Sequence, residues 1–331
     1  MAIKVGIVGV GNCASSLVQG VEYYRDRVDS IGLANPVCAG YPLSTVEFSS
    51  AFDIDSTKVG RDLSQAIWLG PNNSRKFAEV PHLGVEVVDG IQADSLTDVA
   101  ADHIDAIGRA DVTAIAHHLK TTETTIVVNF LPVGAQEATE RYAEAALAAG
   151  CGFINCMPSR LARDPDWARR FDHAGLPLMG DDLTSQFGST MIHRALVTAL
   201  ADNGVRLRNT FQLNSGGNMD FVAMQDRTRM RTKQESKADG AYRNASAVAG
   251  YVGAEYVPFL ADTKVAYIRL EADGFGGTPL DIELRMNVED SPSAAGNVLD
   301  AVRYMARAAA EGRGGVLTTE SELLMKAPGA R

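Results

Sequence analysis

Residues 2–24 read AIKVGIVGVGNCASSLVQGVEYY, and this stretch decides the fold. It opens with Ile3 to Val8, a β-branched apolar run that predicts a buried strand. The turn GVGNCA at residues 9–14 has the GxGxxA spacing, and helical spacing follows from Ser15 to Tyr24. Glycines in such a turn let the backbone approach a pyrophosphate closely, and the helix N-terminus supplies free N–H groups. We therefore predict a dinucleotide-binding unit, with a purely structural strand, turn and helix as the alternative.

The composition restricts the class of protein. The chain has 331 residues, of which 46% are hydrophobic, and this is typical of a folded protein with one or two domains. A net charge of −10 argues against nucleic acid as a partner, although a few local cations can still bind an anionic small molecule. Four cysteines without a CxxC pair predict reduced thiols in a cytoplasmic protein. No 18-residue apolar run is present, so we expect no membrane association.

An acidic residue is expected at the end of the second strand of such a unit. The strand-like segment VEFSSAFDID ends near Asp53, which comes later than the usual spacing of ~20 residues. A loop inserted at residues 29–45 accounts for the delay. A carboxylate there accepts hydrogen bonds from the adenosine ribose and repels a 2′-phosphate, so Asp53 predicts NAD in preference to NADP. A solvated turn residue is the alternative.

Strand-like and helix-like segments then alternate. The segments TTIVVNFLPVG, CGFINCMP and LPLMGDD predict strands, and helices are expected after each of them. Alternation of this kind predicts a doubly wound parallel sheet, whose sites lie beyond the carboxyl ends of the strands. GDDLTSQFGST, residues 180–190, lies at such an end. We assign Asp181 to the cofactor and Asp182 to catalysis, and we predict no metal site.

The pattern changes after Gly204. DIELRMNVE, residues 281–289, alternates apolar and polar residues, and KVAYIRLEADGF predicts its hairpin partner. We expect an α/β fold, a doubly wound Rossmann sheet with an inserted α+β domain on a mainly antiparallel sheet. Residues 1–185 plus 291–331 would form the NAD-binding domain, and residues 186–290 the catalytic and oligomerisation domain. Ser291-Pro292 would begin the returning helix.

Basic residues cluster in the inserted segment. Lys233 and Lys237 belong to a basic run at residues 227–237, which follows the glycine-rich stretch at 216–218. The backbone of such a stretch can bind a phosphate, whereas a solvated charged segment is the alternative. Lys264 opens a strand and by itself would be a surface lysine.

Taken together, these segments resemble the myo-inositol-phosphate synthases in their shorter prokaryotic form. The resemblance runs almost end to end and is carried by VGVGNCASSLVQGVEYY, AFDID, KVGRDLS, LPVG, DPDWARRF, GDDLTSQFG, QLNSGGNMDF, DTKVAYIRLE and EDSPSAAG. It implies tightly held NAD and conversion of a hexose 6-phosphate into a cyclitol phosphate. It also implies association through the inserted domain, and we expect a homotetramer.

The resemblance also implies roles for individual residues. Around the cofactor it implicates Gly9, Gly11, Asn12, Asp62, Thr122, Tyr142, Ser185, Asp220 and Lys233. The motifs described above add Cys13, Asp53 and Asp181 to this set. The resemblance makes Lys233, Lys237 and Lys264 the lysines of the active centre.

The implied reaction explains the need for lysines. C5 of the open-chain sugar is oxidised by NAD, a proton leaves C6, an intramolecular aldol reaction closes the ring, and C5 is reduced again. Negative charge develops on oxygen at each step, and fixed cations stabilise it. We assign the C5 oxygen to Lys264 and the acceptor carbonyl to Lys237. The phosphate of the substrate is expected to accept the proton.

Thr184 departs from the family, in which a lysine normally occupies this position. A charge-assisted hydrogen bond is worth roughly 1.5–3 kcal/mol against about 1 for a neutral one, so the family reaction would slow. An arginine could compensate and leave glucose 6-phosphate chemistry unchanged. Alternatively, C2 of fructose 6-phosphate could be the acceptor and give a five-membered ring, which we favour. An inactive NAD-binding homologue and a simple sugar dehydrogenase remain as further alternatives.

Overall fold

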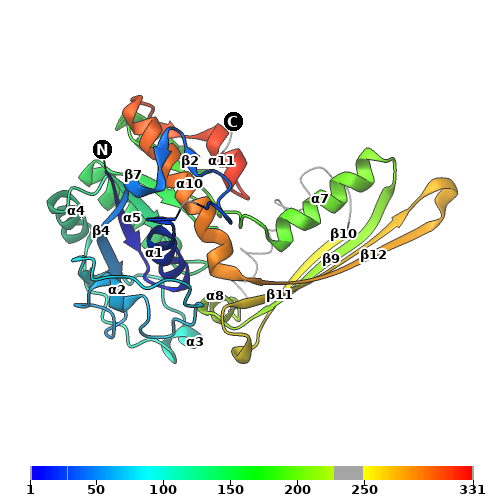
Figure 1. Ribbon diagram of the computed structural model, residues 1–331, viewed down its shortest axis with the longest axis horizontal. Coiled ribbons are helices and arrows are strands. Elements are labelled where there is room, and N and C mark those ends of the chain that lie inside the picture. The colour runs from blue at the N-terminus through cyan, green and yellow to red at the C-terminus, as the bar shows by residue number, and fades with distance from the viewer. Residues whose placement is uncertain (1, 28, 227–248, 330–331) are drawn as a thin grey trace.

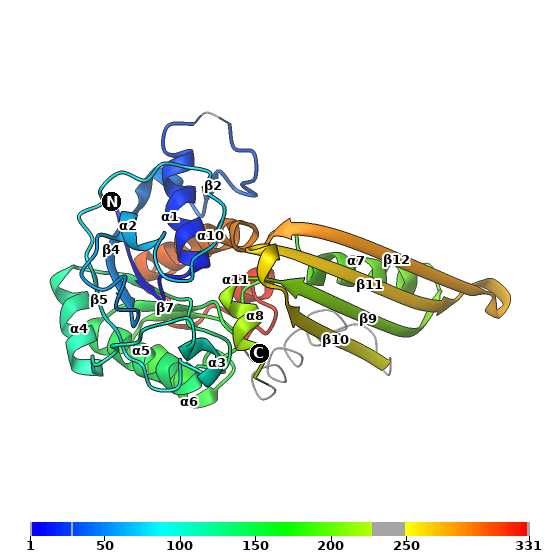
Figure 2. The same cartoon turned by 90° about the horizontal axis from the view of Figure 1, so that it is seen from below.

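The computed structural model describes residues 2–27, 29–226 and 249–329, arranged as a rounded lobe and an elongated arm (Figure 1). The lobe is built on a seven-stranded sheet and the arm on a four-stranded sheet. The arm projects from one side of the lobe in both views (Figures 1 and 2). Within the described residues, no helix is both long and apolar enough to span a membrane.

The seven-stranded sheet has the order β13-β8-β7-β6-β1-β4-β5, and all of its pairings are parallel. Its first six strands in chain order follow the doubly wound arrangement, which confirms the predicted fold class. The strands are β1 Ile3–Val8, β4 Val46–Asp53, β5 Val87–Asp89, β6 Ile126–Asn129, β7 Gly152–Asn155, β8 Pro177–Met179 and β13 Gly315–Val316.

Helices cover both faces of this sheet. They are α1 Asn12–Tyr24, α2 Leu63–Ala66, α3 Asp98–Ala101, α4 Val112–Thr121, α5 Gln136–Ala149, α6 Pro165–His173, α10 Asp290–Ala310 and α11 Thr318–Leu324. One apolar core joins the sheet to α1 and α10, and the other joins it to α4, α5 and α6. Asp164 caps α6 as predicted, because its carboxylate accepts from Asp166 N at 2.8 Å.

The loop inserted before β4 contains β2 Val37–Cys38, β3 Tyr41–Pro42 and the 3-10 turn η1 Leu43–Thr45. A buried ion pair on α10 holds this loop. Arg303 is fully buried, donates to the carbonyls of Asn35 and Pro36 at 2.8 and 3.0 Å, and pairs with Asp300. Asn35 in turn donates to Asp300 at 2.6 Å. The insertion is therefore fixed on the lobe by polar contacts.

The four-stranded sheet has the order β10-β9-β11-β12. Its strands are β9 Arg206–Gly216, β10 Ala249–Tyr256, β11 Thr263–Asp273 and β12 Pro279–Glu289. β11 and β12 form the predicted antiparallel hairpin through η3 Phe275–Gly277, β9 pairs antiparallel with β11, and β10 pairs parallel with β9. Two short elements accompany these strands: η2 Pro258–Leu260 connects β10 to β11, and α8 Met219–Ala223 follows β9 and packs against α3 of the lobe.

Two helix starts differ from the sequence expectation. Helix α7, Ser189–Asp202, packs on one face of the arm sheet and begins after Gly188 rather than at Ser185. Helix α10 begins at Asp290, so Ser291 lies inside its first turn and does not cap it. The Ser291 hydroxyl instead donates to Asp262 at 2.8 Å. A tertiary acceptor has replaced the local capping bond at this position.

Candidate active site

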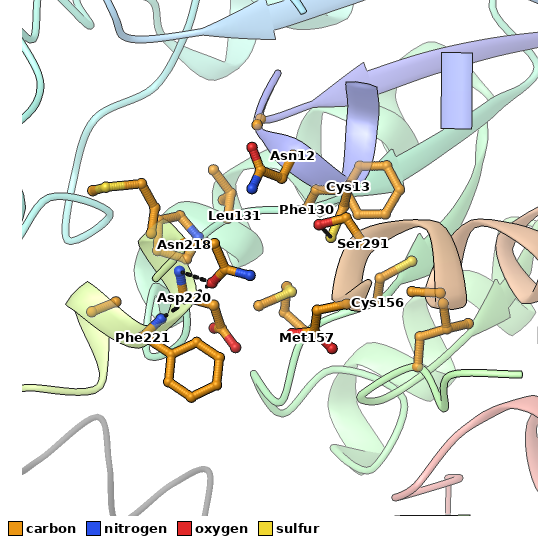
Figure 3. A pocket seen from close by; sticks show the side chains of 18 of the residues that line it. Asn12, Cys13, Phe130, Leu131, Cys156, Met157, Asn218, Asp220, Phe221 and Ser291 are labelled. Carbon is orange, nitrogen blue, oxygen red and sulfur yellow. Dashed lines mark hydrogen bonds between the residues drawn. The ribbon is translucent and has the colours of Figure 1, made fainter. Parts of the chain in front are cut away.

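A cavity of about 240 Å³ lies where the arm meets the carboxyl ends of the central strands (Figure 3). Its walls include Asp53 at the end of β4, Phe130 after β6 and Cys156 after β7. The arm contributes Asp220 of α8 and Lys264 of β11. The cavity therefore lies at the predicted edge of the sheet, and both lobe and arm enclose it.

The glycine turn has room for a pyrophosphate. Gly9 has φ +86°, and a Cβ there would lie 3.0 Å from the carbonyl oxygen of Phe130, so this position requires glycine. Gly11 borders the cavity, and among the described residues nothing lies within 4 Å of the position its Cβ would take. Helix α1 begins at Asn12, so its first N–H groups lie beside this open space. The turn therefore fits a dinucleotide.

Asp53 is fixed at the rim of the cavity. The backbone N–H of Val10 donates to Asp53 Oδ2 at 2.7 Å, and that of Asp55 donates to Oδ1 at 2.9 Å. An ionised carboxylate has about four acceptor sites, so sites remain for ribose hydroxyls. The placement is the one that the prediction of NAD requires.

Lys58 is a buried cation that was not predicted as a site residue. It is 3% exposed, borders the cavity, and donates to the carbonyl of Val10 at 3.0 Å and to Asn72 Oδ1 at 3.2 Å. Its Nζ also lies 3.7 Å from Asp53 Oδ2. Lys58 thus places a positive charge directly behind the glycine turn.

Other predicted cofactor residues line the same cavity, namely Cys13, Tyr142, Ser185 and Asp220. Burial, reinforced by nearby carboxylates, raises the pKa of the Cys13 thiol to about 12, so it stays protonated. Tyr142 is buried, and its hydroxyl accepts from Ile91 N at 2.8 Å. The side-chain amide of Asn12 is engaged with Asn73 and Asp262. Its backbone N–H is therefore the group best placed for a cofactor.

Three predicted cofactor residues do not line this cavity, and their cofactor contacts stay predictions. Asp62 caps α2 and accepts from Ser64 N at 3.0 Å and from two further backbone N–H groups. Thr122 ends α4 at the amino edge of the sheet. Asp181 is fully buried and accepts from Asn155 Nδ2 at 2.8 Å and from the backbone of residues 161–163. Burial raises the pKa of Asp181 despite these donors.

The predicted lysines fall into two groups. Lys233 and Lys237 lie outside the described residues. Lys264, the second residue of β11, borders the cavity and forms an ion pair with Asp290. The paired carboxylate of Asp290 holds the ammonium group of Lys264 in one place, and preorganised stabilisation of an oxyanion requires such a fixed cation.

A second lysine–carboxylate pair lies on the cavity wall. Asp182 is 1% exposed, and its Oδ1 accepts from Lys326 Nζ at 2.7 Å. The pairing of two chain segments sets this contact, because Lys326 N donates to Asp182 O at 2.7 Å and Thr184 N donates to Leu324 O at 2.8 Å. Lys326 was not predicted as a site residue, because its only local signal is a single lysine in the apolar run LLMKAP.

Thr184 faces the same cavity as the two lysines. Its backbone carbonyl accepts from Asn297 Nδ2 at 2.5 Å, which ties this segment to α10. The position at which the resemblance predicts a lysine is thus part of the wall. Thr184 supplies a neutral hydroxyl there, within the segment that pairs with the chain around Lys326.

Known proteins resemble this chain over nearly its whole length. The family described as myo-inositol-1-phosphate synthase matches residues 188–291. The inositol-3-phosphate synthase of Mycolicibacterium smegmatis is 43% identical over 338 residues, covering 98% of this chain and 93% of the relative. That of Corynebacterium glutamicum is 42% identical over 339 residues with the same coverage.

Among solved structures, the crystal structure of Ari2 superposes with a TM-score of 0.83 at 34% identity, covering all of this chain and 93% of that one. The matches extend over both the lobe and the arm. The chain belongs to the myo-inositol-phosphate synthase family.

Proposed function

We propose that this protein is an NAD-dependent cyclitol phosphate synthase that cyclises a hexose 6-phosphate, with fructose 6-phosphate as its preferred substrate. The observation that carries the proposal is one cavity that joins a dinucleotide-binding turn to two lysine–carboxylate pairs. Oxidation of a sugar followed by formation of a carbon–carbon bond within it requires both the dinucleotide and the fixed cations to reach the same substrate molecule. A protein that only bound NAD would have no use for the second.

Bound NAD would accept a hydride from C5 of the sugar and later return it, so the reaction has no net redox change. The protein supplies the remaining chemistry. Lys264, held by Asp290, would stabilise the oxygen on C5 when removal of a proton from C6 turns the ketone into an enolate. The apolar walls, among them Phe130 and Leu131, would exclude water from this charge.

Lys326 would act together with the predicted Lys237 on the second oxygen that becomes charged, the one on the acceptor carbonyl. Its ammonium group is almost buried, and its bond to Asp182 fixes its position on the cavity wall. In an ordinary family member the lysine at position 184 would lie near this wall as well. Here Thr184 supplies only a neutral hydroxyl.

The neutral residue at 184 favours a ketose. In fructose 6-phosphate the acceptor is C2, one carbon nearer to C6 than the aldehyde C1 of glucose 6-phosphate. The same C6 enolate then closes a five-membered ring, and the developing alkoxide lies elsewhere in the cavity. A lysine suited to C1 would be unnecessary there and would occupy space that the ketose needs.

A second candidate is inositol-3-phosphate synthase itself, acting on glucose 6-phosphate. The 43% identity with an enzyme of that name favours it. The proximity of Lys326 to the segment of Thr184 also favours it, since a lysine from the C-terminal segment could replace the missing charge. The arginine that we considered as a compensating group is not needed in this explanation.

Product analysis separates the candidates. The purified protein is incubated with NAD and with either glucose 6-phosphate or fructose 6-phosphate, and the products are identified by NMR. We expect a five-membered cyclitol phosphate from the ketose and little product from the aldose. Robust inositol phosphate formation would overturn the ketose assignment. Net accumulation of NADH would indicate a dehydrogenase, and no product from either sugar would leave the inactive homologue.

The Thr184→Lys variant tests the role of this position. We expect turnover of the ketose to fall about tenfold or more, because the added cation takes up volume and stabilises no oxyanion there. If the variant turns over glucose 6-phosphate faster than the unmodified protein does, the second candidate is correct. Lys264→Ala is the control, since it should remove activity on either sugar.

A further inference from the structure

Asp262 is a buried carboxylate that lies behind the cavity wall. It is 1% exposed and precedes Lys264 by two residues at the start of β11. Its Oδ1 accepts from Ser291 Oγ at 2.8 Å, from Asn12 Nδ2 at 2.9 Å and from Asn218 Nδ2 at 3.0 Å. Four hydrogen bonds reach this carboxylate when Ser291 N, 3.2 Å from Oδ2, is included.

The donors belong to three different elements that line the cavity. Asn12 opens α1 in the glycine turn, Asn218 caps α8, and Ser291 lies in the first turn of α10; all three side chains are drawn in Figure 3. The backbone of Asp262 makes one more link, because its carbonyl accepts from Asp290 N at 3.0 Å. Asp290 is the partner of Lys264.

We infer that Asp262 is a positioning residue that fixes the cofactor's glycine turn relative to Lys264. Through Asn12 it holds the turn that receives the pyrophosphate, and through Asp290 it holds the ion pair beside the reacting carbon. Hydride transfer needs both partners at near-attack distance, so an error of about 1 Å in this link costs rate. The inference rests on the proposed function for the role of Lys264, and on geometry alone for the glycine turn.

The environment of Asp262 makes the link sensitive to pH. Burial is the largest cause that raises the pKa of Asp262, to about 6, and the negative charge of Asp290 adds to it; the amide and hydroxyl donors oppose both. Among the described residues, Asp262 also interacts with Cys13 of α1, whose thiol is protonated and is influenced by Asp290 and by Asp220 of α8 as well. Lys264 is occupied by Asp290.

Acidification should therefore raise the contribution of Asp262 to stability and lower the affinity for NAD. Because the folded pKa of Asp262 is higher than its ordinary value of 3.8, its contribution to stability increases as the pH falls through 6. Protonation also converts its charge-assisted hydrogen bonds into neutral ones, which loosens Asn12 and the glycine turn. We expect NAD affinity to fall while the contribution of this residue to stability rises. A residue with only a structural role would not weaken cofactor binding under conditions that favour the fold.

The test is titration with NAD, by calorimetry, of protein freed of cofactor at about pH 7.5 and about pH 5. The affinity of the unmodified protein for NAD should be roughly three- to tenfold lower at the lower pH. This is the size of effect expected when a charged hydrogen-bond acceptor becomes neutral. Asp262→Asn should bind more weakly at the higher pH and show no such loss on acidification. The exposed Asp26→Asn is the matched control and should behave as the unmodified protein.

Turnover tests the second half of the link. At saturating NAD, Asp262→Asn should lower kcat about tenfold or more with little change in KM for the sugar phosphate. Should this variant not fold, Asn12→Ala removes the same hydrogen bond from its other end and should also abolish the pH dependence of NAD affinity. Equal pH dependence in Asp262→Asn and the unmodified protein would overturn the inference. A protein that lacks cyclase activity but shows the expected NAD titration would contradict the proposed function only.

Discussion

Gly11 is the residue on which cofactor binding most directly depends. Its backbone has φ −90°, which any residue can adopt, and the space beside it is open to the cavity. Gly11→Val should therefore leave folding intact and weaken NAD binding about 100-fold or more, because the side chain occupies the place of the pyrophosphate. Gly11→Ala should have an intermediate effect. A Gly11→Val protein that retains its full NAD content would show that the dinucleotide binds elsewhere.

Lys58 should contribute to both stability and affinity. Lys58→Met removes a buried cation that lies within 4.0 Å of Asp53 and Asp55. The negative charges of these two carboxylates then lose the positive charge that partly neutralises them. We expect a loss of roughly 2–4 kcal/mol in the free energy of unfolding, measured with urea, and about tenfold weaker NAD binding. Lys76→Met is the control, since Lys76 pairs with Glu79 on the exposed surface and should change both quantities little. Unchanged NAD affinity in Lys58→Met would remove this residue from the cofactor site.

Asp181 and Asp182 show what a sequence pattern cannot distinguish. Both follow a predicted strand, and both were assigned to the site. The structure turns Asp181 into the interior, where it orders the loop before α6, and places Asp182 on the cavity wall opposite Lys326. Adjacent residues acquire different surroundings because the backbone turns sharply between them, and no local pattern encodes that turn.

At the scale of elements, the C-terminal segment completes the site. Residues 324–327 pair with residues 181–184, and this pairing carries Lys326 to the cavity. Deletion of residues 325–331 should abolish turnover and leave Asp182 buried without its lysine, which destabilises the lobe by roughly 3 kcal/mol.

Deletion of residues 328–331 is the matched control for this prediction, because it spares Lys326 and its backbone contacts. Product formation and urea unfolding are measured on both proteins. An active enzyme after the longer deletion would exclude Lys326 from catalysis.

Regular elements were predicted well, and their ends less so. The hairpin of β11 and β12 follows from period-two alternation and a Gly-Gly turn, both of which are local signals. Helix α10 could not be placed to the residue, since Ser291 bonds to Asp262, 29 positions earlier in the chain, instead of capping. Lys326 was missed for the same reason: its meaning comes from a residue 144 positions away.

At the scale of the whole molecule, one face of the arm sheet carries an apolar patch beside charged residues such as Arg269 and Glu283. Leu213 is 44% exposed and Tyr251 is 57% exposed, and the strand register places them on one face with Phe211 and Tyr267. Helix α7 covers the opposite face. Exposed patches of this kind on a sheet are typical of subunit interfaces, and we propose that this face assembles the expected homotetramer.

Replacing Leu213 and Tyr251 together with glutamate should dissociate that assembly, because like charges would then meet across an interface of closed symmetry. Light scattering at micromolar concentration measures the mass. The exposed Leu323 of α11, replaced by glutamate, is the control and should leave the mass unchanged. A monomeric unmodified protein would contradict the assembly.

The doubly wound order of the lobe was predictable because each strand and helix carries its own periodicity, and short right-handed connections leave few alternatives. The close approach of the arm to the lobe could not be predicted in this way. That approach depends on side chains such as Asp262 and Asn218, whose partners are far apart in sequence. The sequence therefore predicted that several residues around the glycine turn lie on one cavity, but it did not predict Lys58 or Lys326 there.

The enclosure of the cavity by both lobe and arm has a physiological consequence. Helix α3 packs against α8, and residues of both line the cavity, so these two helices would help to retain a bound dinucleotide. A nucleotide held in this way would serve successive turnovers, since each cycle restores its oxidation state. The enzyme would then draw on no external electron carrier, and its output would follow sugar phosphate supply whether the cell is respiring or starved of oxygen.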